Sequence, residues 1–330
     1  MDIGDAKFVT RTEKKLSKKG FEMSRRFPKN SILFVSIGST IGKCGIAPVE
    51  LTSNQQINAI FPSPSYSVDY LFYAVCTAAP KIKAQAGEQA VPIVNKTQFS
   101  ETAVAIPPLA EQRAIAGALS DVDALLGALD QLIAKKRDLK QAAMQQLLTG
   151  QTRLPGFHGE WMVTRLGDVL KVRHGKSQHG ITSPDGQYPI LASGGEIGRT
   201  NSFIYDKPSV LIGRKGTIDS PQYVDSPFWT VDTLFFTEIS NEADAKFIFY
   251  KFTMIRWRSY NEASGVPSLN AKTIENIEIE IPTLAEQTAI AEVLTDMDAE
   301  LAALEQRRAK TRALKQGMMQ ELLTGRTRLL

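Results

Sequence analysis

The stretch IPPLAEQRAIA at residues 106–116 returns as IPTLAEQTAIA at residues 281–291, an offset of 175 positions. Shorter matches at the same offset surround it: VPIVN at 91–95 with VPSLN at 266–270, LLTG at 147–150 with 322–325, and TRL at 152–154 with 327–329. Self-similarity at one fixed offset is the signature of a duplicated structural unit. The chain therefore consists of two copies of one unit, each with a divergent first part and a closely matched last part.

The matched part of each copy is predicted to be one long helix, from about Leu109 to Thr149 and from Leu284 to Thr324. Apolar residues recur there at alternating spacings of four and three, which is the seam of a coiled coil. The seam residues are Ile115, Leu119, Val122, Leu126, Leu129 and Ile133 in the first copy and Ile290, Leu294, Met297, Leu301 and Leu304 in the second. About 40 residues at 1.5 Å each form a rod of ~60 Å, and the other copy's helix is the nearest partner for its seam.

Signals at the helix ends agree with this interpretation. Thr283 with Glu286 three residues later is the pattern of a capping box, and two prolines precede the first helix instead. Gly150 and Gly325 stand where the end of a helix favours a left-handed residue.

The divergent parts contain short β-like runs among Gly, Pro, Ser and Asp turns, which predicts mixed α/β domains. The runs are SILFVSI at 31–37, INAIFP at 57–62, SVLIG at 209–213, WTVDTLFF at 229–236 and IEIEIP at 277–282. The expected fold class is α+β: two mixed α/β domains, each followed by a long helix, with the helices paired as an antiparallel coiled coil. The expected boundaries are 1–107 and 161–282 for the domains, 108–150 and 283–325 for the helices, 151–160 for the linker and 326–330 for the tail.

The composition, 43% hydrophobic and 22% charged, is typical of a soluble globular protein, and no apolar run approaches the roughly 18 residues of a membrane span. Cys44 and Cys76 form neither a disulfide framework nor zinc-site spacing, which favours a reducing cytoplasm. The net charge of +4 is uneven, because residues 1–30 hold nine Lys or Arg and four acids. Such a patch suits a polyanion, although a solvated basic surface explains it equally well.

The stretch SIGSTIGKCGI at 36–46 has the look of a phosphate-binding loop. A Walker A loop needs four residues between its first glycine and GK, followed by Ser or Thr. Here three residues separate Gly38 from Gly42-Lys43, and Cys44 follows. The corresponding IGRKGTID at 212–219 has no GK. A turn between two strands is therefore favoured over a nucleotide-hydrolysing loop.

Other catalytic patterns are weak. The pairs Asp121/Asp123 and Asp296/Asp298 are two residues apart on a predicted helix, so their carboxylates point to different faces and are expected to be solvated. The histidines at 158, 174 and 179 have no Cys or acid partner at ligand spacing, which predicts no metal site. No dinucleotide loop, adenine-methyltransferase motif or nuclease cluster is found, so the chain is not expected to be an enzyme.

The layout resembles the specificity subunit of type I restriction–modification enzymes. The resemblance rests on ILFVSIGSTIGKCGIA at 32–47, NQQINAIFP at 54–62, LPGFHGEWMVTRLGDVL at 154–170, and LAEQ leading into a long helix that ends in LLTG. It implies that each divergent domain reads one half of a bipartite, asymmetric double-stranded DNA site. It further implies that the paired helices set the gap and carry two modification methyltransferase subunits, joined by motor-nuclease restriction subunits. S-adenosylmethionine, ATP and Mg are expected in those partners, and no cofactor in this chain.

The first copy departs from this pattern. In the second copy, about 40 residues separate the WMVTRLGDVL segment from the strand at 209, whereas only 30 residues precede the first copy's strand at 31. Roughly 50 N-terminal residues of the first recognition domain are expected to be missing, judged from typical domain sizes. An alternative function is therefore a truncated assembly remnant that docks partners and no longer reads a complete site.

Basic and amide side chains of the two domains are the candidates for DNA contact, because Arg and Lys reach guanine and phosphate, and Gln reaches adenine. The candidates are Lys15, Lys18, Lys19, Arg25, Arg26, Lys29 and Lys43 in the first domain, and Arg173, Lys176, Gln178, Arg199, Arg214 and Lys215 in the second, with Arg256 and Arg258 beside Trp257. For each one a solvated surface role remains the alternative, and sequence does not separate phosphate from base contacts.

Overall fold

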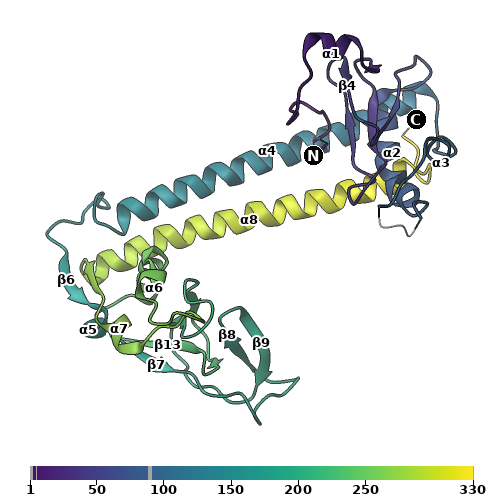
Figure 1. The fold of residues 1–330 in the computed structure, drawn as a ribbon. Helices are drawn as coiled ribbons and strands as arrows, with labels where there is room; N and C mark the ends of the chain where they lie inside the picture. Colours follow the sequence, from purple (N-terminus) through teal and green to yellow (C-terminus); the bar gives the residue numbers. More distant parts are fainter. Residues whose placement is uncertain (1–2, 5, 88–90, 330) are drawn as a thin grey trace. The chain divides into compact units, whose positions relative to one another are not determined.

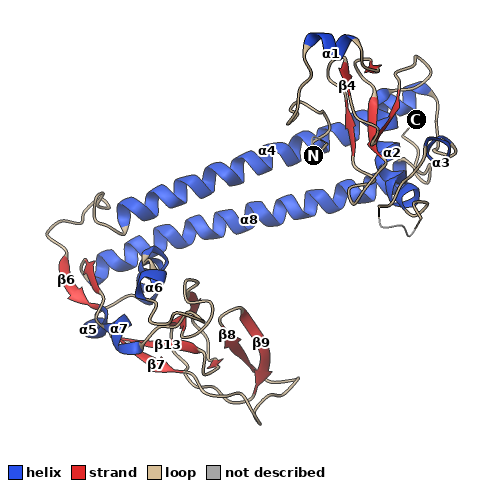
Figure 2. Cartoon of the chain, viewed as in Figure 1, coloured by secondary structure: helices blue, strands red, loops and turns tan. Residues whose placement is uncertain are grey.

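The computed structural model of the chain describes residues 3–4, 6–87 and 91–329. The chain forms two units: the first combines residues up to Leu132 with residues from Leu304 onward, and the second is Ile133–Ala303. Each long helix contributes one part to each unit, and strands occur only in the parts outside these helices, which we call the heads (Figures 1 and 2). Among the described residues, no helix has both the length and the apolar character needed to cross a membrane.

In its described residues, the first head contains two small sheets and three helices. The strands are β1 (Arg26–Phe27), β2 (Ile32–Val35), β3 (Cys44–Ile46), β4 (Leu51–Thr52) and β5 (Ile57–Ile60), and the helices are α1 (Lys18–Glu22), α2 (Val68–Lys83) and α3 (Lys96–Ser100). In one sheet β2 pairs antiparallel with β3 and β5, and in the other β1 pairs antiparallel with β4. The predicted runs at 31–37 and 57–62 are thus confirmed as β2 and β5.

The core of the first head follows the alternation of β2. Ile32 and Phe34 face one hydrophobic cluster with α2, while Leu33 and Val35 face a second cluster that includes Phe27. All four residues of β2 are buried, as expected for a central strand covered on both faces.

The second head is larger and contains three sheets. Its strands are β6 (Met162–Arg165), β7 (Leu170–His174), β8 (Tyr188–Ala192), β9 (Gly195–Thr200), β10 (Ser209–Gly213), β11 (Gln222–Val224), β12 (Trp229–Thr230), β13 (Leu234–Ile239) and β14 (Glu278–Ile281). Its helices are α5 (Leu166–Val169), α6 (Ala245–Met254), the 3-10 turn η1 (Trp257–Tyr260) and α7 (Ala271–Glu275). The strand orders are β11-β10-β13-β7, β12-β8-β9 and β14-β6. The predicted run at 229–236 divides into β12 and the start of β13.

The two heads share one backbone framework around β2 and β10. The Gly38 amide donates to the Pro92 carbonyl at 3.0 Å, and the Gly216 amide donates to the Pro267 carbonyl at 2.9 Å. Both glycines have a positive φ, of 91° and 85°, which favours glycine because it lacks a Cβ. The repeated VPIVN and VPSLN segments therefore dock on equivalent turns, and the duplication extends into the heads.

Helices α4 (Leu109–Leu147) and α8 (Leu284–Leu322) pack together in antiparallel orientation. In the first unit Arg308 pairs with Asp130 at 2.9 Å, and in the second Lys136 pairs with Glu300 at 2.6 Å. As residue numbers rise on one helix they fall on the other, which confirms the predicted antiparallel coiled coil. Each helix ends three residues before a left-handed glycine, Gly150 or Gly325, as the LLTG repeat predicted.

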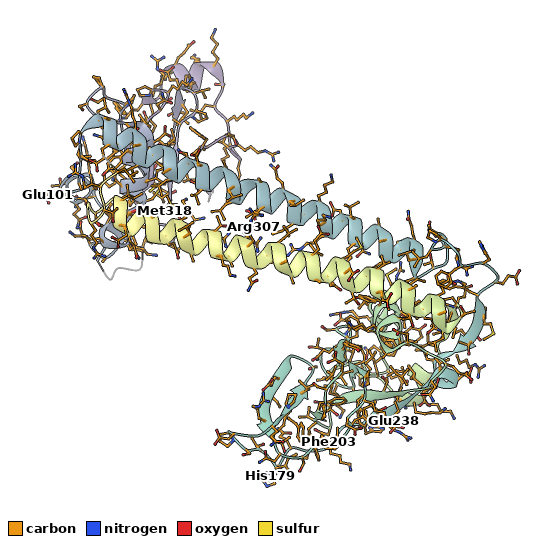
Figure 3. The ribbon with its side chains drawn as sticks, turned by 180° about the vertical axis from the view of Figure 1, so that it is seen from behind. Glu101, His179, Phe203, Glu238, Arg307 and Met318 are labelled. Atoms are coloured by element: carbon orange, nitrogen blue, oxygen red, sulfur yellow. The ribbon has the colours of Figure 1, made fainter. Side chains whose placement is uncertain are left out.

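The predicted seam residues are buried or half-buried. Those buried are Ile115, Leu119, Leu129, Ile133, Ile290 and Leu294, and those half-buried are Val122, Leu126, Met297, Leu301 and Leu304. The first residues of each seam belong to a head as well as to the helix pair. Ile115 and Leu119 join the core around α2, as does Met318 of α8, which is labelled in Figure 3. Ile290 and Leu294 join the core around α6.

In the stretch 36–46, residues 36–43 form the loop that joins β2 to β3, which confirms the strand–turn interpretation. Its amides are engaged inside the protein: those of Gly38, Ile41, Gly42 and Lys43 all donate to backbone carbonyls. A phosphate-binding loop must instead offer such amides to the phosphate. The loop therefore serves as a structural turn.

Lys251 of α6 is a mostly buried cation in the second unit. Its Nζ donates to the Leu148 carbonyl at 3.0 Å and lies 5.6 Å from the centre of the Trp161 ring. Burial lowers the pKa of Lys251 to about 8. Below that pH the folded protein therefore contains a buried ammonium group, whose charge is less well solvated than it is in the unfolded chain.

The stability contribution of Lys251 should consequently depend on pH. Above pH 8 the folded protein releases this proton while the unfolded chain keeps it to about pH 10, so stability rises with pH in this window. We expect the wild type to gain stability relative to Lys251→Met between pH 7.5 and 9.5, measured by urea unfolding. Lys272→Met, at an exposed site on α7, should track the wild type. Parallel pH curves for wild type and Lys251→Met would contradict the assignment.

Candidate nucleic-acid interface and its support

The glutamates of the two LAEQ repeats bind the arginines of the two TRL repeats. Arg328, after α8, donates through Nε and NH2 to Glu111 at the start of α4, both at 2.5 Å. Arg153, after α4, forms the same fork with Glu286 at the start of α8. Both glutamate side chains are almost completely buried, at 3% and 1% exposure. Each unit thus contains one such joint, in which a two-pronged fork fixes distance and direction together.

The fork corrects the expected capping box at the second helix. The Glu286 carboxylate is engaged by Arg153 instead of capping the helix start. In the first unit, the hydrogen bonds from Arg328 hold the pKa of Glu111 below its usual value. That contribution is present at neutral pH and is lost as the pH falls through the lowered pKa, because the protonated carboxyl cannot accept the fork.

The glutamines of the same repeats hold the heads. The Gln112 Oε1 accepts from the Ser67 amide at 2.8 Å, and the Gln287 Oε1 accepts from the Asp244 amide at 3.0 Å. Ser67 and Asp244 are the N-cap residues of α2 and α6. The LAEQ repeat therefore has one residue that binds the segment after the opposite long helix and one that binds the N-terminus of a helix in its own head.

A tyrosine–aspartate–lysine cluster forms a further link in each unit. In the first, the Tyr73 hydroxyl donates to Asp123 at 2.7 Å and the Lys315 ammonium contacts the same carboxylate at 2.6 Å. Burial and the Asp123 hydrogen bond raise the pKa of Tyr73. Lys7 adds to this cluster, with Asp69 at 2.7 Å and the Ser120 hydroxyl at 3.1 Å.

The second unit repeats the cluster. The Tyr250 hydroxyl donates to Asp298 at 2.8 Å and Lys140 contacts the other carboxylate oxygen at 2.5 Å. Asp123 and Asp298 are therefore half-buried links between a head and both helices, which corrects the expectation that these acids are only solvated. Their neighbours Asp121 and Asp296 are exposed, as expected.

Sequence reasoning missed the tyrosines and lysines of these clusters. The lysines lie in the repeated LKQ at 139–141 and 314–316, and the tyrosines end LFY at 71–73 and IFY at 248–250. These short matches were the available signal. They were hard to read because the tyrosine offset is 177 and the helix offset is 175, so one alignment does not contain both.

The candidate DNA contacts of the first head are all exposed. Lys15, Lys18 and Lys19 lie in or just before α1, with Lys29 after β1 and Lys43 in the turn before β3. Arg25 lies over the Phe27 ring at 5.6 Å, and Arg26 faces Glu50 at 3.6 Å. The lysines at 15–19 thus form one local cationic stretch of the head.

Several candidates of the second head already have partners inside the protein. Arg173 pairs with Glu238 at 2.8 Å, Arg258 pairs with Asp219 at 2.6 Å, and Arg214 donates to the Asp232 carbonyl at 3.2 Å. Arg199 donates to the carbonyls of residues 186 and 187 and pairs with Glu196. Their guanidinium groups therefore brace strands and turns.

The remaining candidates of this head are more accessible. Lys176, Lys215 and Arg256 are exposed and Gln178 is half-buried. The loop that contains His179 lies at the end of the second head farthest from α8 (Figure 3). Within the described ranges no group of three or more His, Cys, Asp or Glu is arranged to hold a metal ion.

Comparison with known proteins identifies the family of this chain. The model of the type I restriction modification DNA specificity domain matches the chain twice, over residues 2–136 and 158–312. The chain belongs to this family. The two matches correspond to the two copies of the repeat, so the family match and the duplication agree.

Curated relatives and solved structures of this class resemble the chain over most of its length. The MjaVIII specificity subunit of Methanocaldococcus jannaschii is 25% identical, covering 91% of this chain and 80% of the relative. The EcoprrI specificity subunit of Escherichia coli is 22% identical, covering 86% and 75%. The crystal structure of the S subunit from M. genitalium matches with a TM-score of 0.66 at 19% identity, covering 90% and 83%.

A second solved structure, from work on complex assembly and conformational transition of the type I R-M system, has a TM-score of 0.57 at 16% identity, covering 91% of this chain and 83% of the other. The chain is a type I restriction–modification specificity subunit with the α+β fold of this class. Its LAEQ, LKQ and TRL repeats supply the joints that connect the helix ends and the glutamine and aspartate contacts that attach a head to the helix pair.

Proposed function

We propose that this specificity subunit reads a bipartite, asymmetric DNA site, one half with each head, and performs no catalysis itself. The observation that carries the proposal is the duplicated framework with divergent surface residues. Leu33 of β2 faces Ala59 of β5 as Leu211 of β10 faces Phe236 of β13, so Phe61, directly after β5, takes the place of Glu238 in β13. Equal scaffolds with different exposed side chains are suited to reading two different half-sites.

The proposal includes the docking of two modification methyltransferase subunits on the helices, and of motor-nuclease subunits through them. Exposed apolar residues of α4 support it. Leu125 and Leu132 of α4 are 40% and 39% exposed and stand seven residues apart on one face. Exposed apolar residues in such a row favour contact with another protein. S-adenosylmethionine, ATP and Mg would then be bound by the partners, in the cytoplasm that holds the DNA.

Methylome sequencing of cells that express this chain with a cognate methyltransferase subunit tests the proposal. The expected result is one bipartite motif with modified adenine in each half, whereas the chain alone should leave DNA unmodified. Methylation by the purified chain with S-adenosylmethionine would overturn the non-catalytic assignment. A complex that assembles without any sequence preference would favour the alternative of an assembly remnant.

The lysines around α1 should contribute mainly through phosphate contact. In the complex with the methyltransferase, replacing Lys15, Lys18 and Lys19 together by alanine should weaken binding to all duplexes alike. The slope of log affinity against log salt should fall by about 1 for each lysine that contacts a phosphate. Fluorescence anisotropy between 50 and 200 mM salt measures both quantities, a range over which such contacts have large effects.

The matched control is the triple variant Lys135→Ala, Lys310→Ala and Arg312→Ala, which removes three exposed cations from the helices. An equal loss of slope in the control and in the head variant would show that α1 has no particular role.

A further inference from the structure

The two heads place a pair of side chains on the same backbone frame, but the side chains differ in chemistry. Ile37 forms an isolated antiparallel bridge with Ile93 in the first head, and Lys215 forms one with Ser268 in the second. Ile37 and Lys215 each precede the left-handed glycine of the turn that follows β2 or β10. We call Ile37 with Ile93 the first pair, and Lys215 with Ser268 the second pair.

Hydrogen bonds fix both pairs in the same geometry. The Val94 amide donates to the Ser36 carbonyl at 2.9 Å, and the Leu269 amide donates to the Arg214 carbonyl at 2.9 Å. Together with the glycine bonds to the repeated VPIVN and VPSLN segments, these bonds flank each pair on both sides. This is the type of antiparallel pair in which the two side chains lie closest, and both stand on one face of the ladder. The two side chains of a pair can therefore contact a ligand together.

The pairs stand on the side of the frame that faces away from the core. Val94 and Leu269, each next to a member of a pair, are buried at 1% and 4% exposure. Ile93, by contrast, is 44% exposed, Ile37 is half-buried and Lys215 is exposed. Neither isoleucine belongs to the hydrophobic clusters formed by the described residues of the first head. The first pair is therefore available for a contact outside the chain.

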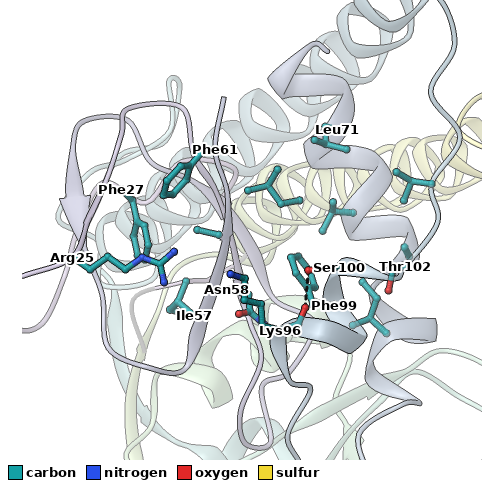
Figure 4. Close-up of a pocket in the computed structure, with 16 residues that line it drawn as sticks. Arg25, Phe27, Ile57, Asn58, Phe61, Leu71, Lys96, Phe99, Ser100 and Thr102 are labelled. Atoms are coloured by element: carbon teal, nitrogen blue, oxygen red, sulfur yellow. Dashed lines mark hydrogen bonds between the residues drawn. The ribbon is translucent and has the colours of Figure 1, made fainter. Parts of the chain in front are cut away.

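Neighbouring side chains of the first head point to a different place. Asn58 donates to the Ser36 hydroxyl at 2.8 Å, and Asn58 and Lys96 line a cavity of about 510 Å³ beside β5 (Figure 4). Ile37 and Ile93 are not among the residues that line this cavity. The first pair thus belongs to a separate surface of the head.

The difference between the pairs fits a ligand that itself differs between the heads. Two copies of one methyltransferase subunit, or the phosphate backbone of DNA, would favour exposed residues that the heads share. Lys29 and Lys207 are such residues, because each is exposed and stands two residues before a fully buried serine, Ser31 or Ser209. The pairs share their frame and not their side chains. Base edges, which differ between the halves of an asymmetric site, are the ligand that such a difference suits.

Each pair suits a different base. A lysine ammonium donates to the O6 and N7 acceptors of guanine in the major groove, and a serine hydroxyl can donate or accept beside it. Lys215 is available for this contact because it forms no ion pair among the described residues, unlike Arg173 and Arg258. Isoleucine side chains offer no hydrogen bond, and apolar side chains contact the methyl group of thymine.

We propose that the two pairs determine one base pair in each half-site: the second pair reads a guanine, and the first pair reads a thymine through its methyl group. The proposal rests on the proposed reading of one half-site by each head, and it names residues that distinguish the halves. The pairs should be exchangeable between the heads, because the flanking hydrogen bonds join main-chain atoms.

Exchange of the pairs tests the proposal through methylome sequencing of cells that express the chain with its methyltransferase partner. Ile37→Lys with Ile93→Ser should change one base of the first half-site from thymine to guanine. Lys215→Ile with Ser268→Ile should make the reverse change in the second half-site. In each variant the half-site of the unchanged head should stay the same, which is the internal control for folding and assembly.

Lys215→Ala gives a second measurement, because it only shortens one exposed side chain. The preference of the complex for guanine at one position of the second half-site should fall about fivefold or more, as for the loss of one good base contact. Fluorescence anisotropy with duplexes changed at each position in turn measures this preference. Lys207→Ala is the matched control, and it should weaken binding to all these duplexes alike.

The possible failures can be told apart. A wild-type bipartite motif that neither exchange alters would overturn the assignment of the pairs, as would an equal loss of preference in Lys215→Ala and Lys207→Ala. Loss of the methyltransferase from the exchange variants, with the motif and the Lys215→Ala preference unchanged, would assign the pairs to a protein contact and overturn it as well. A wild-type complex that modifies DNA without a bipartite motif would overturn the reading function itself.

Discussion

Replacing Trp257 with alanine is expected to lower the free energy of unfolding of the second unit by about 3–5 kcal/mol, the range for deleting a large buried aromatic. Trp257 is 1% exposed, and its ring centre lies 5.0 Å from that of Phe252. Its indole N–H donates to the Phe252 carbonyl at 2.8 Å, so the substitution loses packing and orphans an acceptor. Trp257 therefore belongs to the core, although the sequence places it between two candidate DNA contacts.

All three tryptophans of the chain, at 161, 229 and 257, lie in the second unit, so intrinsic tryptophan fluorescence reports its unfolding alone. The measurement is urea denaturation of Trp257→Ala, followed through the two tryptophans that remain. The control is Trp229→Ala, whose ring is only half-buried and whose N–H donates to the Lys176 carbonyl at 2.9 Å. A larger loss in the control than in Trp257→Ala would show that η1 is peripheral to the core.

Asp298→Ala is expected to destabilise the second unit by about 1.5–3 kcal/mol, the range for a hydrogen bond to a charged group. The substitution leaves the Tyr250 hydroxyl, on a side chain only 3% exposed, without its acceptor and removes the partner of Lys140. The same urea experiment measures the effect.

Asp296→Ala is the matched control because it removes an equal charge two residues away, at an exposed position. Its effect should stay within about 0.5 kcal/mol, as for most surface substitutions. Equal effects of the two variants would mean that Asp298, like Asp296, acts only as a surface charge and does not stabilise the contact with the head. The pair thus separates the link to the head from general electrostatics.

These links explain why the motifs are repeated. The joint at Glu111 or Glu286 connects the start of one long helix to the segment that follows the other, and the cluster at Asp123 or Asp298 attaches a head to both helices. Such contacts tie a head to the scaffold at several points, while the strands beyond them are free to differ. This division is consistent with the proposed reading of two different half-sites by the two heads.

Much of the fold could be predicted because it depends on local periodicity. The helix bounds, the strands at 31–37 and 57–62, and the glycine turns follow from spacing and from residues that favour one backbone conformation. The prediction of a capping box at Glu286 was wrong because the Glu286 carboxylate binds Arg153, 133 residues away. A motif that satisfies a local rule can still be used for a distant contact.

The candidate site was predictable only in part. Residue type identified the cations, but not which of them already pair with acids of the same head, as Arg173 does with Glu238. That pairing depends on β7 lying beside β13, a neighbour relation between strands about 60 residues apart that no spacing rule contains. The predicted contacts at Lys15, Lys18 and Lys19 remain predictions about DNA.

By itself the sequence determined that this protein is a duplicated unit with two long helices, because a repeat and a heptad seam are properties of the chain read along its length. Only the tertiary structure decided that Asp123 and Asp298 are links and not solvated charges, and that Trp257 belongs to the core. Burial and pairing are set by what lies beside a residue in space, and those neighbours come from segments that folding brings together.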